Sequence, residues 1–312
     1  MPDLKDCKIV FLGTPPFSVA ILDKLVVEGC NIVGVVTAPD KPAGRGLQMT
    51  PSAVKKYALD KGLNILQPEK LKDPLFLEKL KSLQADVQVV VAFRMLPEAV
   101  WNMPPLGTIN LHASLLPEYR GAAPINWAII HGEKETGITT FKLQHAIDTG
   151  DILLREKISI HEDDTAGSLH DRMMLQGADL VYKTLLAYCK GDIQPQSQSN
   201  ISPEKSLKLA PKIHTSTCEI NWHVNAKQVY DLIRGLSPYP GAFTNLNNKM
   251  LKVYHSKYTL EHHQKSPGTV ESDGKTYLRF ATKDGWVYFN ELQLEGKKRM
   301  DIDSFLKGYR HN

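Results

Sequence analysis

Two side chains with complementary chemistry lie close together in the stretch Thr108 to Arg120, which reads TINLHASLLPEYR. Asn110 and His112 are two positions apart in a predicted strand, so both point to the same face of a sheet. An amide supplies an N–H donor, and an imidazole can donate when protonated and can shuttle a proton. At the carboxyl end of a strand, where open α/β sheets bind ligands, the two could stabilise the oxyanion that forms when a carbonyl becomes tetrahedral. The alternative is a hydrogen-bonded pair at a strand end with no chemical role.

A carboxylate that could complete this pair follows in the segment HAIDTGDILL, where Asp148 comes shortly after a strand candidate at 138–143. Near His112, the Asp148 carboxylate would orient the imidazole and favour its charged form. Asp-Thr-Gly is also typical of a tight turn, in which Asp caps the backbone. The sequence alone does not show whether the two side chains meet.

An α/β sheet is the predicted scaffold for these residues. The runs 8–13 and 31–37 are apolar, and the stretch between them has helical periodicity, which together indicate a strand–helix–strand opening. Further strand candidates lie at 87–93, 108–111 and 138–143, and helical patterns lie at 52–61, 75–84, 124–132 and 165–190. Residues 1–190 therefore predict an open, doubly wound, mostly parallel sheet.

A smaller β domain is predicted for residues 213–312. The segment 191–212 is polar and contains three prolines, as linkers often do. A helical pattern at 227–236 is followed by short strand patterns that are separated by turn signals. We expect a small antiparallel barrel here.

Positive charge is concentrated in the last third of the chain. Residues 201–312 hold 17 Lys and Arg against 11 Asp and Glu, a balance of +6, whereas residues 1–200 balance at −2. A cationic module suits a polyanionic partner, because phosphate contacts release counterions. The long loop 37–54 adds Lys41 and Arg45, and Arg45 lies between two glycines from which it could bind phosphate or stack on a base. A surface loop without a ligand is the alternative.

Composition excludes several classes of protein. With 312 residues, 42% hydrophobic and 23% charged, the chain is not fibrous or disordered. The four cysteines have no metal-site or redox spacing, and His262-His263 lies in a turn-like setting, so we expect no metal. The apolar runs are far shorter than the ~20 residues that span a bilayer, and the N-terminus lacks the features of a signal peptide. We expect no membrane contact and a cytoplasmic location.

Five motifs give the chain a family resemblance: GTPPFS, PAGRG, NLHASLLPEYRGAAP, IDTGDIL and SPYPGAFT. In this order and spacing, from Lys8 nearly to the C-terminus, the chain resembles the methionyl-tRNA formyltransferases. The pattern NxHxSLLPxxRG marks the wider folate-dependent formyltransferase superfamily, which includes glycinamide ribonucleotide and sugar N-formyltransferases. The PAGRG loop and the basic C-terminal module narrow the choice to the tRNA enzymes.

The resemblance implies a Rossmann-like domain followed by an OB-like β-barrel that binds tRNA. It implies formyl transfer from 10-formyltetrahydrofolate, a co-substrate, to the free amine of initiator methionyl-tRNA for translation initiation, without a metal. Because the sequence has no heptad seam or edge motif that calls for a dimer, we expect a monomer. The site residues that the resemblance implies are Asn110, His112 and Asp148 for catalysis, Ser114, Leu115, Leu116 and Pro117 for the folate, and Arg45 and Lys41 for the tRNA.

One segment departs from the family pattern. Ala92–Pro97 reads AFRMLP where many relatives have a Tyr-Gly-Gln-Ile-type segment, so a charged Arg94 borders the expected pterin pocket.

Three alternative functions stay open. A sugar-nucleotide N-formyltransferase would use the same chemistry on a small amine, but would have no use for the long loop and the basic tail. A 10-formyltetrahydrofolate hydrolase would use water in place of the amine. A non-catalytic RNA-binding protein would use the basic barrel alone.

Overall fold

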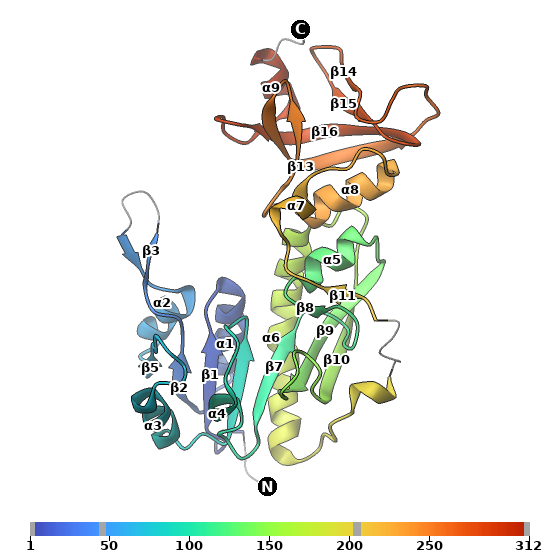
Figure 1. Ribbon diagram of the computed structural model, residues 1–312. Coiled ribbons are helices and arrows are strands. Elements are labelled where there is room, and N and C mark those ends of the chain that lie inside the picture. The colour runs from blue at the N-terminus through green and yellow to red at the C-terminus, as the bar shows by residue number, and fades with distance from the viewer. Residues whose placement is uncertain (1–3, 44–47, 202–206, 309–312) are drawn as a thin grey trace. The chain divides into compact units, whose positions relative to one another are not determined.

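The protein is described here from a computed structural model, which covers residues 4–43, 48–201 and 207–308 (Figure 1). The chain forms two compact units. The first unit comprises Met1–Arg120, Gly137–Ile158 and Asp171–Lys208, and the second comprises Gly121–Thr136, Ser159–His170 and Leu209–Asn312. The units are therefore interleaved in sequence, and the predicted domain limits at 190 and 213 stay a prediction.

A seven-stranded sheet forms the centre of the first unit, in the order β10-β9-β7-β6-β1-β2-β5. The pairs β1–β2, β1–β6, β2–β5 and β6–β7 are parallel, and β7–β9 is antiparallel. This confirms the predicted doubly wound, mostly parallel sheet. The sheet and the helices around it are β1 (Ile9–Gly13), α1 (Pro16–Val27), β2 (Ile32–Val36), α2 (Ala53–Asp60), β5 (Ile65–Leu66), α3 (Pro74–Ser82), β6 (Val87–Val91), α4 (Glu98–Trp101), β7 (Thr108–His112), β9 (Glu135–Lys142), β10 (Ile152–Ser159) and α6 (Ala166–Lys190).

Local sequence explains these elements. All five residues of β1 and of β6 are buried, as expected for parallel strands covered on both faces. Helix α2 begins after Ser52, whose hydroxyl accepts a hydrogen bond from the N–H of Lys55 at 3.0 Å. Asp73 caps α3 in the same way, accepting from Leu75 N–H at 3.0 Å. The predicted helices are confirmed, with ends that shift by one or two residues.

The strand order reverses between β1 and β6, which is where open α/β sheets bind their ligands. The buried Ser18 hydroxyl joins the two strand ends by donating to the Val91 carbonyl at 2.7 Å. Gly13 ends β1 with no room for a side chain, since a Cβ there would lie 2.6 Å from the Cβ of Ser18. The carboxyl ends of β1, β6 and β7 therefore form one edge of the sheet.

Helix α6 packs closely on β7. A Cβ at Gly177 would lie 2.7 Å from the Leu111 side chain, so glycine allows this approach. The hydroxyls of Thr140 and Thr184 meet at 2.8 Å, which joins α6 to β9 as well. Helix α6 therefore holds both the strand that carries Asn110 and His112 and its neighbour β9.

The long loop predicted at 37–54 contains two short strands, β3 (Lys41–Ala43) and β4 (Gln48–Thr50), which pair antiparallel. The Asp40 carboxylate anchors the start of this hairpin. It forms an ion pair with Lys55 Nζ at 2.7 Å and accepts a hydrogen bond from the Gln67 amide at 2.9 Å. The hairpin could not be predicted because its strands are only three residues long and are exposed where their burial is described.

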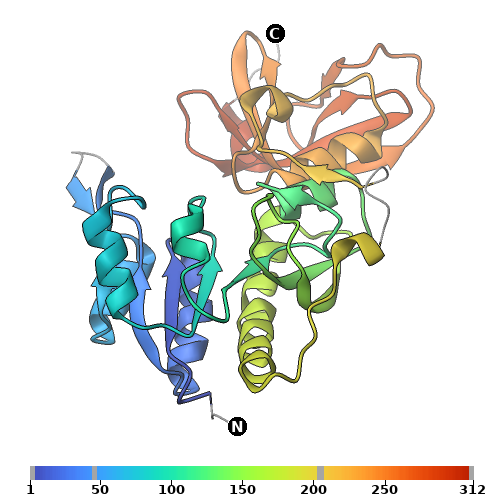
Figure 2. The ribbon, with the colours of Figure 1, turned by 60° about the horizontal axis from the view of Figure 1, so that its bottom comes forward.

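The second unit is built on an antiparallel sheet in the order β12-β13-β16-β15-β14, with β17 also paired to β16. This sheet is a half-barrel, and both ribbon views show α8 lying along it (Figure 2). The apolar core between α8 and the sheet includes Ile233, Val253 and Phe289. The remaining elements of the described chain are β8 (Arg120–Gly121), α5 (Pro124–Ile130), η1 (Gln198–Asn200), β11 (Leu209–Ala210), α7 (Thr215–Cys218), α8 (Ala226–Gly235), β12 (Ala242–Leu246), β13 (Lys249–Leu260), β14 (Val270–Ser272), β15 (Leu278–Ala281), β16 (Gly285–Leu294), β17 (Met300–Asp301) and α9 (Ile302–Gly308).

Within the described residues, none of the helices combines the length and the apolar character that crossing a membrane requires.

Candidate active site

The imidazole of His112 lies at the carboxyl end of β7, where it is 7% exposed. Its Nε2 is 2.9 Å from the carbonyl oxygen of Tyr119. Because a carbonyl can only accept, Nε2 is the protonated nitrogen, and Nδ1 carries the lone pair when the ring is neutral. Tyr119 has a φ of +59°, so a turn with left-handed backbone brings this carbonyl to the ring.

Asp148 faces the other ring nitrogen. Its Oδ2 lies 3.8 Å from Nδ1 of His112, and both side chains are largely buried. Asp148 itself has a φ of +53°, within the IDTG turn between β9 and β10. The structure therefore brings together the two residues whose contact the sequence left open.

Asn110 lies two residues before His112 in β7 and is half-buried. Val90 of β6 and Phe141 of β9 are its neighbours across the sheet. Among the described residues, none forms a hydrogen bond with the side-chain amide of Asn110. The amide N–H is therefore available to a ligand.

The loop Ser114–Pro117 is held by its own backbone and by Thr139 of β9. The fully buried Thr139 hydroxyl donates to the Ser114 carbonyl at 2.6 Å and accepts from the Leu116 N–H at 3.1 Å. The Ser114 hydroxyl donates to the Glu118 carbonyl at 2.6 Å, and the Leu116 side chain is buried. Leu115 is half-buried and packs over Gly137. The loop is thus rigid, and its predicted contacts with a cofactor stay a prediction.

Gln198 is a site residue that the sequence did not reveal. Its side-chain N–H groups donate to the carbonyls of Asp148 and Gly150, each at 2.8 Å. Its oxygen accepts from Arg120 Nε at 3.0 Å and from Arg120 Nη2 at 2.7 Å. The polar composition of residues 191–212 predicts a linker and gives no sign of these contacts.

Arg94, which departs from the family pattern, makes its contacts with residues of the first unit. Its guanidinium donates to the carbonyls of Glu69, at 2.8 Å, and Pro68. It also lies over the Phe93 ring, 5.6 Å from the centroid. Burial lowers the pKa of the Arg94 guanidinium. Part of its hydrogen-bonding capacity is thus used within the protein.

The structure describes only one of the two residues predicted to bind tRNA. Lys41 is exposed on β3, opposite Thr50. Arg45 lies outside the described residues. The tRNA contacts of both stay a prediction.

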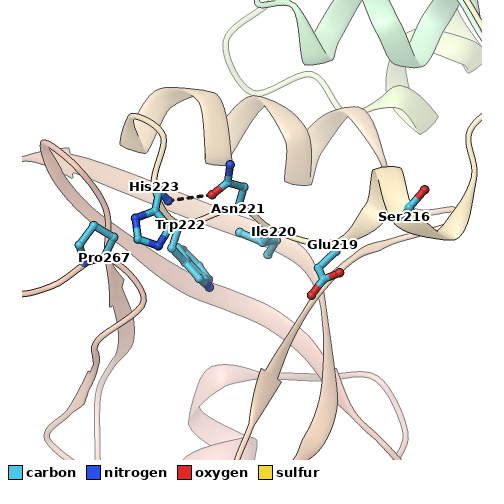
Figure 3. Close-up of a pocket in the computed structure, with 7 residues that line it drawn as sticks. All are labelled: Ser216, Glu219, Ile220, Asn221, Trp222, His223 and Pro267. Atoms are coloured by element: carbon cyan, nitrogen blue, oxygen red, sulfur yellow. Dashed lines mark hydrogen bonds between the residues drawn. The ribbon is translucent and has the colours of Figure 1, made fainter.

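A hollow of about 440 Å³ lies in the second unit, lined by Ser216, Glu219, Ile220, Asn221, Trp222, His223 and Pro267 (Figure 3). The Trp222 ring stacks on Phe280 with centroids 4.6 Å apart, and its Nε1–H donates to the Thr244 hydroxyl at 3.1 Å. Trp286 is 2% exposed. Both tryptophans therefore belong to the packing of the sheet, and none of the predicted site residues lines the hollow.

Metal-ligating side chains do not gather anywhere in residues 4–43, 48–201 and 207–308: no three of His, Cys, Asp or Glu are placed to hold an ion. His263 instead contacts the Trp286 ring and the Gly285 carbonyl. The four cysteines are free thiols.

Family models match both parts of the chain. Residues 7–185 match the family described as formyl transferase, and residues 212–310 match the formyl transferase C-terminal domain. Curated relatives named methionyl-tRNA formyltransferase are similar over almost the full length. The protein from Bacteroides thetaiotaomicron is 51% identical and that from Phocaeicola vulgatus 54%, each over 98% of this chain and 97% of the relative.

Solved structures share the fold at low identity. An N-formyltransferase from Helicobacter canadensis, in complex with folinic acid and dTDP-3-aminofucose, has a TM-score of 0.68 at 19% identity, over 91% of this chain and 98% of that one. HypX from Aquifex aeolicus, in complex with tetrahydrofolic acid, has a TM-score of 0.64 at 18% identity, over 97% of this chain and 48% of that one. The family models and the full-length relatives settle the assignment: the chain belongs to the methionyl-tRNA formyltransferase family.

Proposed function

We propose that this chain transfers the formyl group of 10-formyltetrahydrofolate to the free α-amine of initiator methionyl-tRNA, in preparation for translation initiation. The observation that carries the proposal is the convergence of His112 and Asp148, at 3.8 Å, beside the available amide of Asn110. The chain that carries this trio is about half identical, over almost its full length, to proteins named methionyl-tRNA formyltransferase.

The oxyanion is assigned to Asn110. When the amine attacks the formyl carbon, the carbonyl oxygen gains negative charge, and a fixed N–H donor aimed at it is worth ~3–4 kcal/mol of barrier. Both ring nitrogens of His112 already face protein acceptors, so the amide of Asn110 is the donor for this oxygen.

We assign the transfer of the proton from the attacking amine to His112, with the Asp148 carboxylate as its support. The attacking amine loses a proton as the new C–N bond forms, and N10 of the folate gains one as its bond to the formyl carbon breaks. The lone pair on His112 Nδ1 can take the proton that the amine loses and pass it to N10, and the Asp148 carboxylate stabilises the positive charge that the ring carries in between. The charged ring also favours the negative oxygen nearby. No covalent intermediate is needed.

The folate and the tRNA would contact different parts of the chain. We assign the folate to the edge of the sheet beside Ser114–Pro117, since this loop follows His112 directly. We assign the tRNA to Lys41, Arg45 and the basic module at 213–312, because a balance of +6 suits a polyanion. The enzyme would act as a cytoplasmic monomer.

The sugar-nucleotide alternative has weaker support. Sugar formyltransferases are only 19% identical to this chain. Relatives at 47–54% identity bear the tRNA enzyme's name.

One assay separates the candidates. The protein is incubated with 10-formyltetrahydrofolate and with charged initiator methionyl-tRNA, an amino-sugar nucleotide, or buffer alone. We expect formylation of the methionyl-tRNA. Transfer to the sugar alone, or release of formate in buffer at an equal rate, would overturn the proposal.

A further inference from the structure

Gln198 is a buried amide whose hydrogen-bonding capacity is completely used. It is 2% exposed, and its two N–H groups and its oxygen make four hydrogen bonds of 2.7 to 3.0 Å. The orientation of the amide is unambiguous, because an arginine can only donate and a backbone carbonyl can only accept. Such a fully satisfied buried group is costly to replace.

The two ends of this amide reach the two turns that enclose His112. On one side, its N–H groups hold the backbone of Asp148, whose carboxylate faces His112 Nδ1. On the other side, its oxygen holds Arg120, the residue after Tyr119, whose carbonyl accepts from His112 Nε2. One side chain therefore links the supports of both ring nitrogens.

Both turns have backbone conformations that residues other than glycine seldom adopt. The φ angles are +53° at Asp148 and +59° at Tyr119. Such turns persist only when neighbouring structure holds them. Gln198 is itself well anchored, because two hydrogen bonds of 2.8 and 2.9 Å join the backbone of Gln196 to that of Ile152 in β10.

We infer that Gln198 is a positioning residue, which sets the separation between the Asp148 carboxylate and the His112 imidazole. The inference rests on the proposed function, in which these two groups move the proton. Misplacement of a catalytic group by about 1 Å can cost ~10²-fold in rate. A residue that holds catalytic groups in place can therefore limit turnover without touching the substrates. Its loss acts on the chemical step and leaves the binding of both substrates unchanged.

The first test is a steady-state comparison of Gln198→Met, which has a similar length and no polar group, with the unmodified enzyme. We expect kcat to fall ~10-fold or more, while KM for methionyl-tRNA and for the formyl donor stays within about twofold. Gln196→Met is the matched control, since Gln196 is exposed and uses only its backbone. Its kcat should equal that of the unmodified enzyme.

A second variant covers the case in which Gln198→Met does not fold. Gln198→Asn keeps the amide but is one methylene shorter, so it cannot reach Arg120 and both carbonyls together. Its kcat should fall below that of the unmodified enzyme, while KM for both substrates stays within about twofold. A normal kcat in a folded variant, or a loss expressed only as higher KM, would overturn the inference.

A spectroscopic measurement separates this inference from the proposed function. In the ¹⁵N-histidine-labelled protein without substrates, the signal lost in His112→Gln identifies the His112 ring. That ring should be protonated at Nε2 in the unmodified protein, and its nitrogen shifts should change in Gln198→Met but not in Gln196→Met. If the unmodified protein transfers no formyl group, the proposed function fails. The comparison of nitrogen shifts still tests whether Gln198 positions the Asp148 carboxylate and the His112 ring. Unchanged shifts in Gln198→Met would refute the inference.

Discussion

The Oδ2 of Asp148 lies 3.8 Å from the Nδ1 of His112, although 36 positions of sequence separate the two residues. The contact depends on the left-handed backbone of Asp148, which turns its carboxylate toward β7. The imidazole is thus held between this carboxylate and the Tyr119 carbonyl. Any proton that reaches Nδ1 is therefore received next to a negative charge.

Replacing Asp148 by Asn tests this charge while keeping the size of the side chain. Without the carboxylate, the proton on His112 is no longer stabilised, so we expect kcat to fall ~10- to 100-fold with little change in either KM. Single-turnover formyl transfer measures the effect on the chemical step. Asp192→Asn, an exposed change in the same unit, is the control. Equal losses in the two variants would contradict the assignment.

Replacing Asn110 by Ala removes the donor assigned to the oxyanion. One such donor is worth ~10²–10³-fold in kcat, so the variant should lose at least ~10²-fold. Folding should be unaffected, because the amide has no partner among the described residues. Circular dichroism and thermal melting check the fold, and formyl transfer checks the rate. Turnover close to that of the unmodified enzyme would remove Asn110 from the mechanism.

Much of this arrangement is readable from the sequence. Strand β1 is apolar throughout and β6 is apolar except for Gln88, and the two-residue spacing of Asn110 and His112 places both on one face of β7. Local capping also agrees with the fold, as Ser52 and Asp73 begin their helices. These features depend on short-range periodicity, which a single sequence expresses well.

The remaining features depend on contacts between distant segments. Gln198 lies in a stretch whose composition is typical of linkers, yet it reaches back 50 positions to Asp148. The meeting of Asp148 with His112 requires a φ of +53°, which an Asp-Thr-Gly sequence permits but does not require. Tertiary hydrogen bonds of this kind leave no periodic signal.

Thr139→Val tests the support of the loop that follows His112. The substitution leaves the Ser114 carbonyl and the Leu116 N–H without their buried partner, which costs about 1–3 kcal/mol of unfolding free energy. Urea denaturation measures this loss. Thr136→Val is a matched control on the same strand, since the Thr136 hydroxyl is buried with no hydrogen-bond partner among the described residues. The control should be as stable as the unmodified protein or more so, and the reverse ranking would be inconsistent with the support role of Thr139.

Arg45→Ala tests the tRNA contact expected from the sequence. Loss of one phosphate contact should raise KM for methionyl-tRNA and reduce the slope of log affinity against log salt by about one. The KM for the formyl donor should not change. Kinetics at several salt concentrations measure both quantities. A change in folate binding with unaltered tRNA kinetics would show that the loop serves the cofactor instead.

Asp40→Asn tests the anchor of the β3–β4 hairpin through its pH dependence. Hydrogen bonds from Lys55 and Gln67 hold the pKa of the Asp40 carboxyl below its ordinary value. Because the folded pKa is the lower one, the stabilisation is complete above the unfolded value of about 3.9 and is lost as the pH falls through the folded value. At neutral pH the variant should therefore unfold at lower urea, and its deficit should shrink as the pH drops below about 4. Urea titrations across this range measure the deficit, with Asp60→Asn as the control because Asp60 is 74% exposed and lies 3.6 Å from Lys61. A deficit that stayed constant down to pH values of about 3 would mean that Asp40 acts through packing and not through its charge.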